Sequence, residues 1–260
     1  RGELGDLFVN DAFATLHRSH ASTLGVADHL PAFAGLLVQK EIAALFPLLG
    51  KPKRPYIAVV GGKKAKSKLG PLRDLVSRVD VVLLGGGVAF TFLAALGADV
   101  GDSIVDPAVF DEIHEIQEIA SERGTEILLP VDGVAAQEVK AEAATRLVDA
   151  RDIADGWIGL DIGPETIEVF CELISTAGTI VWTGPMGAFE MGPFAHGTRA
   201  IGEAIAASDA YSVIGGGETG EAAVRFGFDT GVSFISTGGG ACLALLRGKP
   251  LPALDVLFAA

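Results

Sequence analysis

Cysteine, aromatic side chains and positive charge are all scarce in this 260-residue chain. Its two cysteines, Cys171 and Cys242, are far apart and in no spacing typical of a metal site, so no disulfide framework is indicated. Each is expected to be a buried thiol in a reducing, cytoplasmic setting. The formal net charge of −13 argues against general nucleic-acid binding, which needs clustered lysine and arginine.

Unbroken hydrophobic runs of membrane-spanning length are also missing. Residues 81–98 form an uncharged stretch of 18 residues, which meets the length for a membrane span. Three glycines at 85–87 interrupt it, however, so a short buried strand followed by a turn and a helix is favoured. We therefore expect no membrane association.

What the chain does contain is apolar residues, at 49%, and 34 glycines. Short apolar runs alternate with amphipathic stretches of helical period, such as 109–123, 165–176 and 198–207. This alternation predicts an α/β fold, a three-layer, Rossmann-like parallel sheet with helices on both faces. The expected strands are 56–60, 81–84, 127–129, 158–160, 179–182, 211–214 and 233–235.

The first fifty residues do not follow this alternation. Apolar residues recur at helical spacing over 31–50, and Gly50, Pro52 and Pro55 would end that helix, which could connect two domains. Residues 1–30 hold a strand-like run and a turn rich in histidine and arginine. Because the chain begins at Arg1 with no start of a domain, we expect that an N-terminal part precedes it.

Four glycine-rich turns are the most informative feature: 61–64, 85–87, 215–219 and 237–240. Each follows an expected strand and leads into a helical pattern. Glycine lets the backbone approach a ligand closely, and the helix N-terminus beyond it offers free N–H groups to a phosphate. One such turn would be no more than a tight turn, but four at the carboxyl edge of one sheet predict a site for the phosphates of ATP or ADP.

Lysines reinforce this prediction at the first turn. Lys64 and Lys68 are four residues apart and are expected on one face of the helix that opens after Gly61 and Gly62. Lys63 and Lys66 add to the charge. The alternative is a solvated basic turn, but in so acidic a chain a phosphate contact is favoured.

The stretch 181–190 is the most distinctive in sequence. An expected strand runs into a Gly-Pro turn that ends with the isolated carboxylate of Glu190. The alternative is a rigid loop with a surface glutamate. The functional interpretation is that Glu190 accepts hydrogen bonds from the ribose hydroxyls of a nucleotide.

Together these motifs, in this order and approximate spacing, resemble the phosphoglycerate kinase family over essentially the full chain. The matching stretches are 9–13, 17–22, 61–68, 85–87, 129–132, 156–164, 182–190, 215–219 and 236–241.

The resemblance implies a two-domain kinase fold. Residues 1–30 would be a remnant of the N-terminal phosphoglycerate-binding domain, 31–50 the interdomain helix, and 51–240 the C-terminal nucleotide-binding domain. Residues 241–260 would form a C-terminal helix and tail that return toward the N-terminal domain. About 150 residues, one domain's worth, would precede Arg1.

The resemblance also implies site residues. Lys64 and Lys68 would contact nucleotide phosphates, with Lys68 neutralising the transferring phosphoryl group. Glu190 would bind the ribose, and Glu218 would take the position of the metal-binding aspartate. The remaining nucleotide contacts would be Gly61, Gly62, Gly85, Gly86, Gly159, Leu160, Pro185, Gly217 and Thr219.

A second group of residues would serve the other substrate. Gly238, Gly239 and Gly240, at a helix N-terminus, would hold the phosphoryl group in transit. Arg18, with His17 or His20 nearby, would be the surviving part of the phosphoglycerate site.

The implied reaction is a glycolytic one, the reversible transfer of a phosphoryl group between 1,3-bisphosphoglycerate and ADP, with Mg²⁺ as the metal of the ADP/ATP complex. Such transfer needs positioning and charge neutralisation rather than a covalent enzyme intermediate. The resemblance also suggests a monomer.

Two alternatives stay open. The chain could be a nucleotide-binding module without turnover, since the absent domain would supply the substrate site. An NAD-dependent oxidoreductase is disfavoured, because no dinucleotide fingerprint follows the first strand of the alternating region.

Some residues depart from the family pattern. Glu218 is one methylene longer than the usual aspartate, and Thr183 replaces an asparagine. Further departures lie at Lys63, Lys66, Ser67 and Ala14. We expect them to tune nucleotide affinity rather than abolish it.

Overall fold

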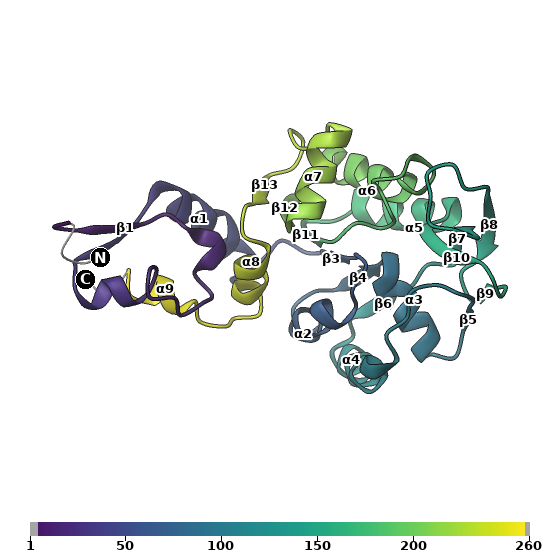
Figure 1. Ribbon diagram of the computed structural model, residues 1–260, viewed down its shortest axis with the longest axis horizontal. Coiled ribbons are helices and arrows are strands. Elements are labelled where there is room, and N and C mark those ends of the chain that lie inside the picture. The colour runs from purple at the N-terminus through teal and green to yellow at the C-terminus, as the bar shows by residue number, and fades with distance from the viewer. Residues whose placement is uncertain (1–4, 258–260) are drawn as a thin grey trace.

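The computed structural model describes residues 5–257 and has two lobes of unequal size. The larger lobe is built on the alternating strands and helices of the middle of the chain (Figure 1). The smaller lobe combines the first residues of the chain with the last, together with α1 (Leu36–Leu49).

A six-stranded parallel sheet forms the centre of the larger lobe, in the order β13-β12-β11-β3-β4-β6. All of its strands were predicted, with bounds within one residue of those observed. They are β3 (Tyr56–Val60), β4 (Val81–Leu84), β6 (Glu126–Leu128), β11 (Thr179–Thr183), β12 (Tyr211–Gly215) and β13 (Phe234–Ser236).

The two faces of this sheet bury separate apolar clusters. Along β3, Tyr56, Ala58 and Val60 belong to one cluster, and Ile57 and Val59 to the other. Such alternation follows from the period of two along a strand. Both faces are apolar because both are covered, as is usual for parallel sheets.

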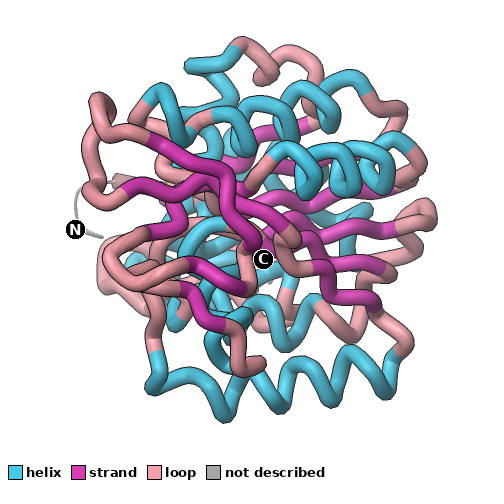
Figure 2. The backbone as a smooth tube through the Cα atoms, turned by 90° about the vertical axis from the view of Figure 1, so that its right-hand side faces the viewer, coloured by secondary structure: helices cyan, strands magenta, loops and turns pink. Residues whose placement is uncertain are grey.

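Helices cover both faces, as predicted (Figure 2). One cluster includes residues of α2 (Lys66–Leu75), α3 (Gly86–Ala95), α4 (Phe110–Arg123) and α8 (Gly239–Leu246). The other includes residues of α5 (Pro164–Ser175), α6 (His196–Ala207) and α7 (Gly217–Phe226). The three-layer α/β prediction is therefore confirmed.

The prediction of a parallel-sheet strand at 158–160 is wrong in its placement. β10 (Ile158–Ile162) pairs antiparallel with β7 (Asp132–Ala136), which pairs antiparallel with β8 (Thr145–Asp149). β7 was not among the expected strands, because Asp, Gly and Ala are poor strand formers. A short parallel pair, β5 (Asp99–Val100) and β9 (Asp152–Ile153), and the 3₁₀ turn η4 (Pro107–Val109) complete this side.

The helix expected over 31–50 starts later than predicted. Residues 32–34 form β2 (Ala32–Ala34), which pairs in parallel with β1 (Phe8–Asn10). The first helical turn of α1 is held by Asp11, whose Oδ1 accepts from the N–H of Val38 at 3.0 Å. A contact remote in sequence therefore sets the start of the helix, and periodicity alone could not show it.

Contacts between distant segments hold the smaller lobe together and connect it to the rest of the chain. Oε1 of the buried Glu41 on α1 accepts from both the N–H and the hydroxyl of Thr237, each at 2.7 Å. The N–H of Ala253, in α9 (Pro252–Asp255), donates to the carbonyl of Leu16 at 3.2 Å, after the 3₁₀ turn η2 (Phe13–Thr15). A second 3₁₀ turn, η3 (Gly25–Asp28), follows. The ends of the predicted 1–30 and 241–260 segments, residues 1–4 and 258–260, lie outside the described residues.

Within residues 5–257 no helix has the length and apolar character needed to cross a membrane. The uncharged stretch 81–98 is divided between β4 and α3, as the glycines predicted. Both cysteines are free thiols, Cys242 buried and Cys171 half-buried.

Gly202 in α6 offers a test of the packing on one face. A side chain there would collide with the ring of Phe228, which stacks on Trp182 at 5.6 Å between ring centroids. We expect Gly202→Ala to lower the free energy of unfolding by about 1–2 kcal/mol, because overpacking outweighs the gain in helix propensity. Urea denaturation measures this change.

The matched control is Gly192→Ala, since a side chain at Gly192 would have no atom within 4 Å. It should leave stability nearly unchanged. Equal stability of the two variants would mean that Phe228 moves aside without cost.

Candidate functional site

The order of the strands identifies the point in the large sheet where a ligand is expected to bind. From β3 the chain continues outward to β4 and β6, and from β11 it continues in the other direction to β12 and β13. β3 and β11 are neighbours in the sheet, so the direction in which successive strands are added reverses between them. Ligands of open α/β sheets bind at the carboxyl ends of the strands at such a point.

The turns that follow these two strands are hydrogen-bonded to each other. The N–H of Gly61 donates to the carbonyl of Thr183 at 2.9 Å, and that of Gly62 to the carbonyl of Pro185 at 2.8 Å. A side chain at Gly61 would collide with the carbonyl of Pro185, and one at Gly184 with the backbone of Gly61. Glycine is therefore required here because two backbones pass in contact.

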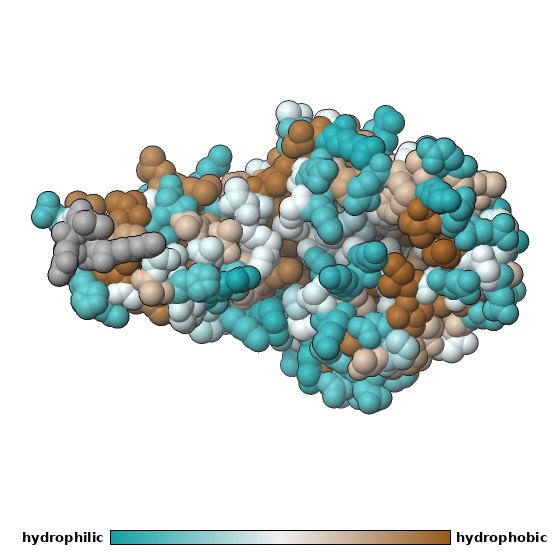
Figure 3. Space-filling view, viewed as in Figure 1, coloured by the Kyte–Doolittle hydropathy of each residue, from teal (hydrophilic) through white to brown (hydrophobic). Residues whose placement is uncertain are grey.

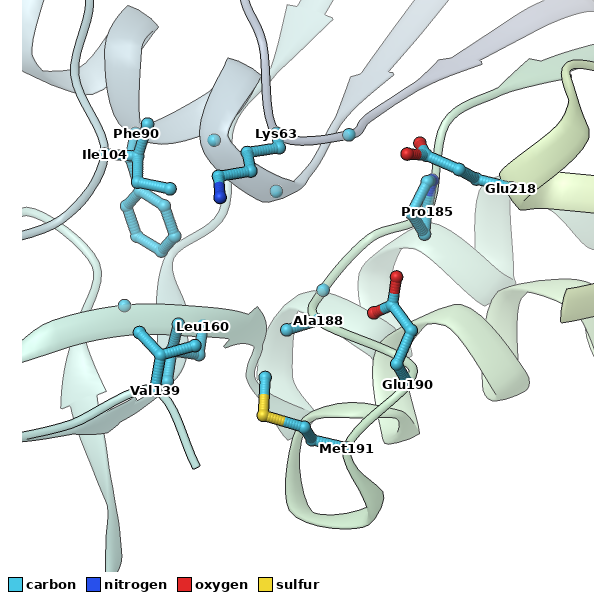
Figure 4. A pocket seen from close by; sticks show the side chains of 15 residues that line it. Lys63, Phe90, Ile104, Val139, Leu160, Pro185, Ala188, Glu190, Met191 and Glu218 are labelled. Carbon is cyan, nitrogen blue, oxygen red and sulfur yellow. The ribbon is translucent and has the colours of Figure 1, made fainter. Parts of the chain in front are cut away.

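A cavity of about 250 Å³ opens at this edge (Figure 4). Five segments line it: the turn after β3, the start of α3, strand β10, the loop after β11 and the first turn of α7. Ile104 and Val139 close it from two further loops. The predicted residues that line it are Gly62, Gly86, Gly159, Leu160, Pro185, Glu190 and Glu218.

The walls of the cavity divide by polarity. Phe90 and Ile104 lie on one side, and the carboxylates of Glu190 and Glu218 lie on the other (Figure 4). On the molecular surface, apolar residues gather between the positions of α3 and β10 (Figure 3). An apolar slot with convergent polar groups at one side suits a ligand with a flat ring and a polar extension.

Some of the predicted glycines are needed for close packing around the cavity. A side chain at Gly85 would meet Sδ of Met186 at 2.6 Å, so Gly85 lets the turn after β4 pack against the loop after β11. Gly159 does line the cavity, but a side chain there would also collide with the ring of Phe90. Part of the glycine pattern therefore serves close packing around the cavity.

The two predicted lysines have different surroundings. Nζ of Lys68 donates to Oγ1 of Thr183 at 2.7 Å, which joins α2 to the end of β11. Burial lowers the pKa of Lys68, and the nearby carboxylate of Glu218 acts in the opposite direction. Lys68 is thus a half-buried cation close to the carboxyl edge of the sheet.

The expectation that Lys64 shares a helix face with Lys68 is wrong, because α2 begins at Lys66. Lys64 is exposed in the turn before the helix, where its carbonyl accepts from the hydroxyl of Ser67 at 3.0 Å. Lys63 instead extends into the cavity (Figure 4).

The start of α7 supplies both charge and main-chain N–H groups. Gly216 precedes the helix with φ of +113°, a backbone conformation that residues other than glycine rarely adopt. Gly217 and Glu218 are exposed in the first turn. Thr219 is buried, and its hydroxyl accepts from the N–H of Gly184 at 2.7 Å, so this side chain positions the loop after β11.

Glu218 is the one predicted metal ligand. Within residues 5–257 no three acidic, histidine or cysteine side chains cluster as a metal site would require. Mg²⁺ commonly binds through one or two carboxylates and completes its shell with substrate phosphates and water. The exposed carboxylate of Glu218, which lines the cavity, fits that mode of binding.

The start of α8 lies next to the same turn. A side chain at Gly239 would lie 2.9 Å from Cα of Gly216, and one at Gly240 would lie 3.1 Å from Cε1 of His17. Gly238 is the N-cap residue and packs against Phe13 and Ala14. The fourth glycine turn, 237–240, therefore lies between the carboxyl edge of the sheet and the residues around His17.

His17 and Arg18 are adjacent in space as well as in sequence. Nε of Arg18 donates to Nε2 of His17 at 3.2 Å, while Nδ1 of His17 is buried without a hydrogen-bond partner among the described residues. Burial, and then the charges of Arg18 and His20, lower the pKa of His17. His17 is therefore uncharged at neutral pH, and Arg18 is the exposed cation.

Comparison with known proteins gives a consistent result. A family model described as phosphoglycerate kinase matches residues 2–249. The structure of phosphoglycerate kinase from Coxiella burnetii is similar over 98% of this chain, with 42% identity and a TM-score of 0.92. That from Pyrococcus horikoshii OT3 also matches over 98% of this chain, with 36% identity and a TM-score of 0.87.

The chain belongs to the phosphoglycerate kinase family. It spans 66% and 64% of the length of these two relatives. Like those structures, it has a six-stranded parallel sheet flanked by helices.

Several residues that line the cavity were not predicted at the site: Phe90, Ile104, Val139, Gly187, Ala188 and Met191. Phe90 follows Gly86 by four residues on α3, so helical spacing could have indicated it. Ile104 and Val139 come from loops that no motif links to the glycine turns, and only the tertiary structure brings them to the cavity.

Asp161 lies directly behind the cavity and is completely buried. Its Oδ1 accepts from the N–H of Ile162 at 2.9 Å, and its Oδ2 from the N–H of Gly197 at 2.8 Å. Burial raises its pKa from 3.8 to about 8, although the N–H groups of Gly197, Ile162 and His196 oppose the change.

This shift predicts how stability depends on pH. The folded protein keeps the Asp161 proton up to a pH of about 8, whereas the unfolded chain releases it near 3.8. Folding therefore binds a proton in this window, and this group's contribution to the free energy of unfolding decreases as pH rises from 3.8 to about 8.

Urea denaturation at several pH values, for the native protein and for Asp161→Asn, isolates this contribution. The difference between the two proteins should change steadily across the window. A constant difference would mean that Asp161 ionises at its ordinary pKa.

Proposed function

We propose that this chain binds the magnesium complexes of ADP and ATP in the cavity between β3 and β11. The adenine ring lies in the apolar slot beside Phe90 and Leu160, and Glu190 accepts hydrogen bonds from the ribose. The phosphates extend toward Lys68 and the N-terminus of α7. One observation carries the proposal: at the point where the strand order changes, a single cavity combines apolar walls, glycine turns and two carboxylates.

The proposed reaction is that of a phosphoglycerate kinase, phosphoryl transfer between 1,3-bisphosphoglycerate and ADP to give 3-phosphoglycerate and ATP. Lys68 would stabilise the charge on the transferring group, because a half-buried cation interacts more strongly than one in water. The N-terminus of α8, at Gly238–Gly240, would present N–H groups to the same oxygens. Thr219 would contribute its main-chain N–H, since its hydroxyl already binds Gly184.

Magnesium would be held by Glu218 together with nucleotide phosphates, and it would neutralise phosphate charge during transfer. The exposure of Glu218 leaves its carboxylate accessible to a metal that arrives with the nucleotide. Arg18 would contact phosphoglycerate as a permanent cation, and His17 would orient it through their hydrogen bond.

A second candidate is nucleotide binding without turnover by these 260 residues on their own. It is favoured because Arg18 and His17 are the only phosphoglycerate contacts proposed in a chain that spans 66% and 64% of its two relatives. The cytoplasmic location and the monomeric state stay predictions.

Substitution of Lys68 tests the direction in which the phosphates extend. We expect Lys68→Met to bind ADP about tenfold more weakly and to bind adenosine as well as the native protein, because the lost charge faces only the phosphates. Isothermal titration calorimetry with ADP and with adenosine measures both affinities.

The matched control is Lys249→Met, which removes the same charge at an exposed position after α8. It should leave both affinities unchanged. A parallel loss of ADP affinity in both variants would indicate a general charge effect rather than a contact from Lys68.

An activity measurement separates the two candidates. With ATP and 3-phosphoglycerate in a coupled assay, we expect ADP binding by the 260-residue chain but negligible turnover. Robust turnover would refute the second candidate and establish that the chain is sufficient for the reaction.

A further inference from the structure

Asp161 connects three segments that meet at the nucleoside end of the cavity. It belongs to β10, directly after the cavity residues Gly159 and Leu160. Its carboxylate accepts from the N–H of Gly197 at the start of α6 and lies against Gly187 in the loop after β11. A side chain at either of these glycines would collide with the carboxylate.

Further hydrogen bonds make these segments one unit. Oγ1 of Thr198 accepts from the N–H of Met186 at 3.0 Å, which attaches the loop after β11 to α6. The N–H of Ala188 donates to the carbonyl of Leu160 at 2.8 Å, which attaches the same loop to β10. The carboxylate of Asp161 is buried where α6, β10 and this loop converge.

We propose that Asp161 is a positioning residue for nucleoside binding, which holds Gly159–Leu160 and Gly187–Ala188 at the separation that the nucleoside requires. It does not line the cavity and acts through the two walls. The inference rests on the proposed function of the cavity. An ionised carboxylate accepts from main-chain N–H groups at both oxygens, whereas an amide accepts at only one.

The environment of Asp161 contains few charges. Burial and main-chain N–H groups account for the change in its pKa. The titratable or charged side chains on the elements around it are Asp132 on β7, Glu190 in the loop after β11, and His196, Arg199 and Glu203 on α6. Glu190 and His196 are exposed, and Arg199 pairs with Glu203 at 2.7 Å.

Asp132 provides an internal comparison. It too accepts from a helix start: Oδ1 from the N–H of Thr166 at 2.8 Å and Oδ2 from the N–H of Glu165 at 3.0 Å. It too lies against a glycine, Gly163, where a side chain would collide with it. Asp132 holds the start of α5 rather than that of α6.

The test compares Asp161→Asn with Asp132→Asn, both nearly isosteric substitutions, in calorimetric titrations with adenosine and with ADP at a pH above about 8, where Asp161 is ionised. We expect Asp161→Asn to bind both ligands about tenfold more weakly, and by the same factor, because one wall is released and the phosphate contacts are unchanged. Asp132→Asn should bind both within a factor of about two of the native protein, although it also loses a helix-capping hydrogen bond.

Three results would overturn the inference: unchanged affinity in Asp161→Asn, equal losses in the two variants, or a loss confined to ADP. If Asp161→Asn does not fold, the pH dependence of adenosine binding by the native protein decides. Affinity should increase several-fold as pH rises through about 8, as the carboxylate ionises, and a flat profile would contradict the proposal.

Failure of the proposed function gives a different result. If the native protein binds neither adenosine nor ADP, the cavity is not a nucleotide site, and both the function and this inference are refuted. If it binds both and only the Asp161 variant behaves differently from expectation, the function stands and the positioning role falls.

Discussion

The parallel pairing of β3 with β11 is the constraint on which the site depends. It aligns the carboxyl ends of the two strands and so brings together the turns that follow them, which are more than a hundred residues apart in sequence. Gly61 and Gly184 then pass close enough for main-chain hydrogen bonds, with no room for a side chain on either. The two turns pack tightly against each other, and the cavity opens beside them, where Gly62 and Pro185 line it.

Two lysines lie close to the cavity in an otherwise acidic chain. The chain carries a formal net charge of −13, yet Lys63 and Lys68 lie near the carboxyl edge of the large sheet. Lys68 is held by Thr183, the residue that stands where related sequences are expected to have asparagine. A hydroxyl can accept from the ammonium as an amide carbonyl would, so this departure keeps the hydrogen bond while removing an amide donor.

Periodicity and turn residues predicted the parallel sheet well, because its strands are apolar along their whole length and end in glycine. The same approach misplaced β10, since an apolar run does not state whether its neighbours are parallel or antiparallel. It also began the helix of residues 31–50 too early, because Asp11 caps α1 from outside the segment. Lys64 was assigned to a helix that starts two residues later.

The site shows the same division between local and distant information. The sequence by itself determined the glycine turns, the two carboxylates and Lys68, because their order and spacing are local properties of the chain. Only the tertiary structure decided that Ile104 and Val139 close the cavity, and that Asp161 is buried behind it rather than exposed within it. Those outcomes depend on which distant segments pack together, and packing is governed by shape and burial that no single segment encodes.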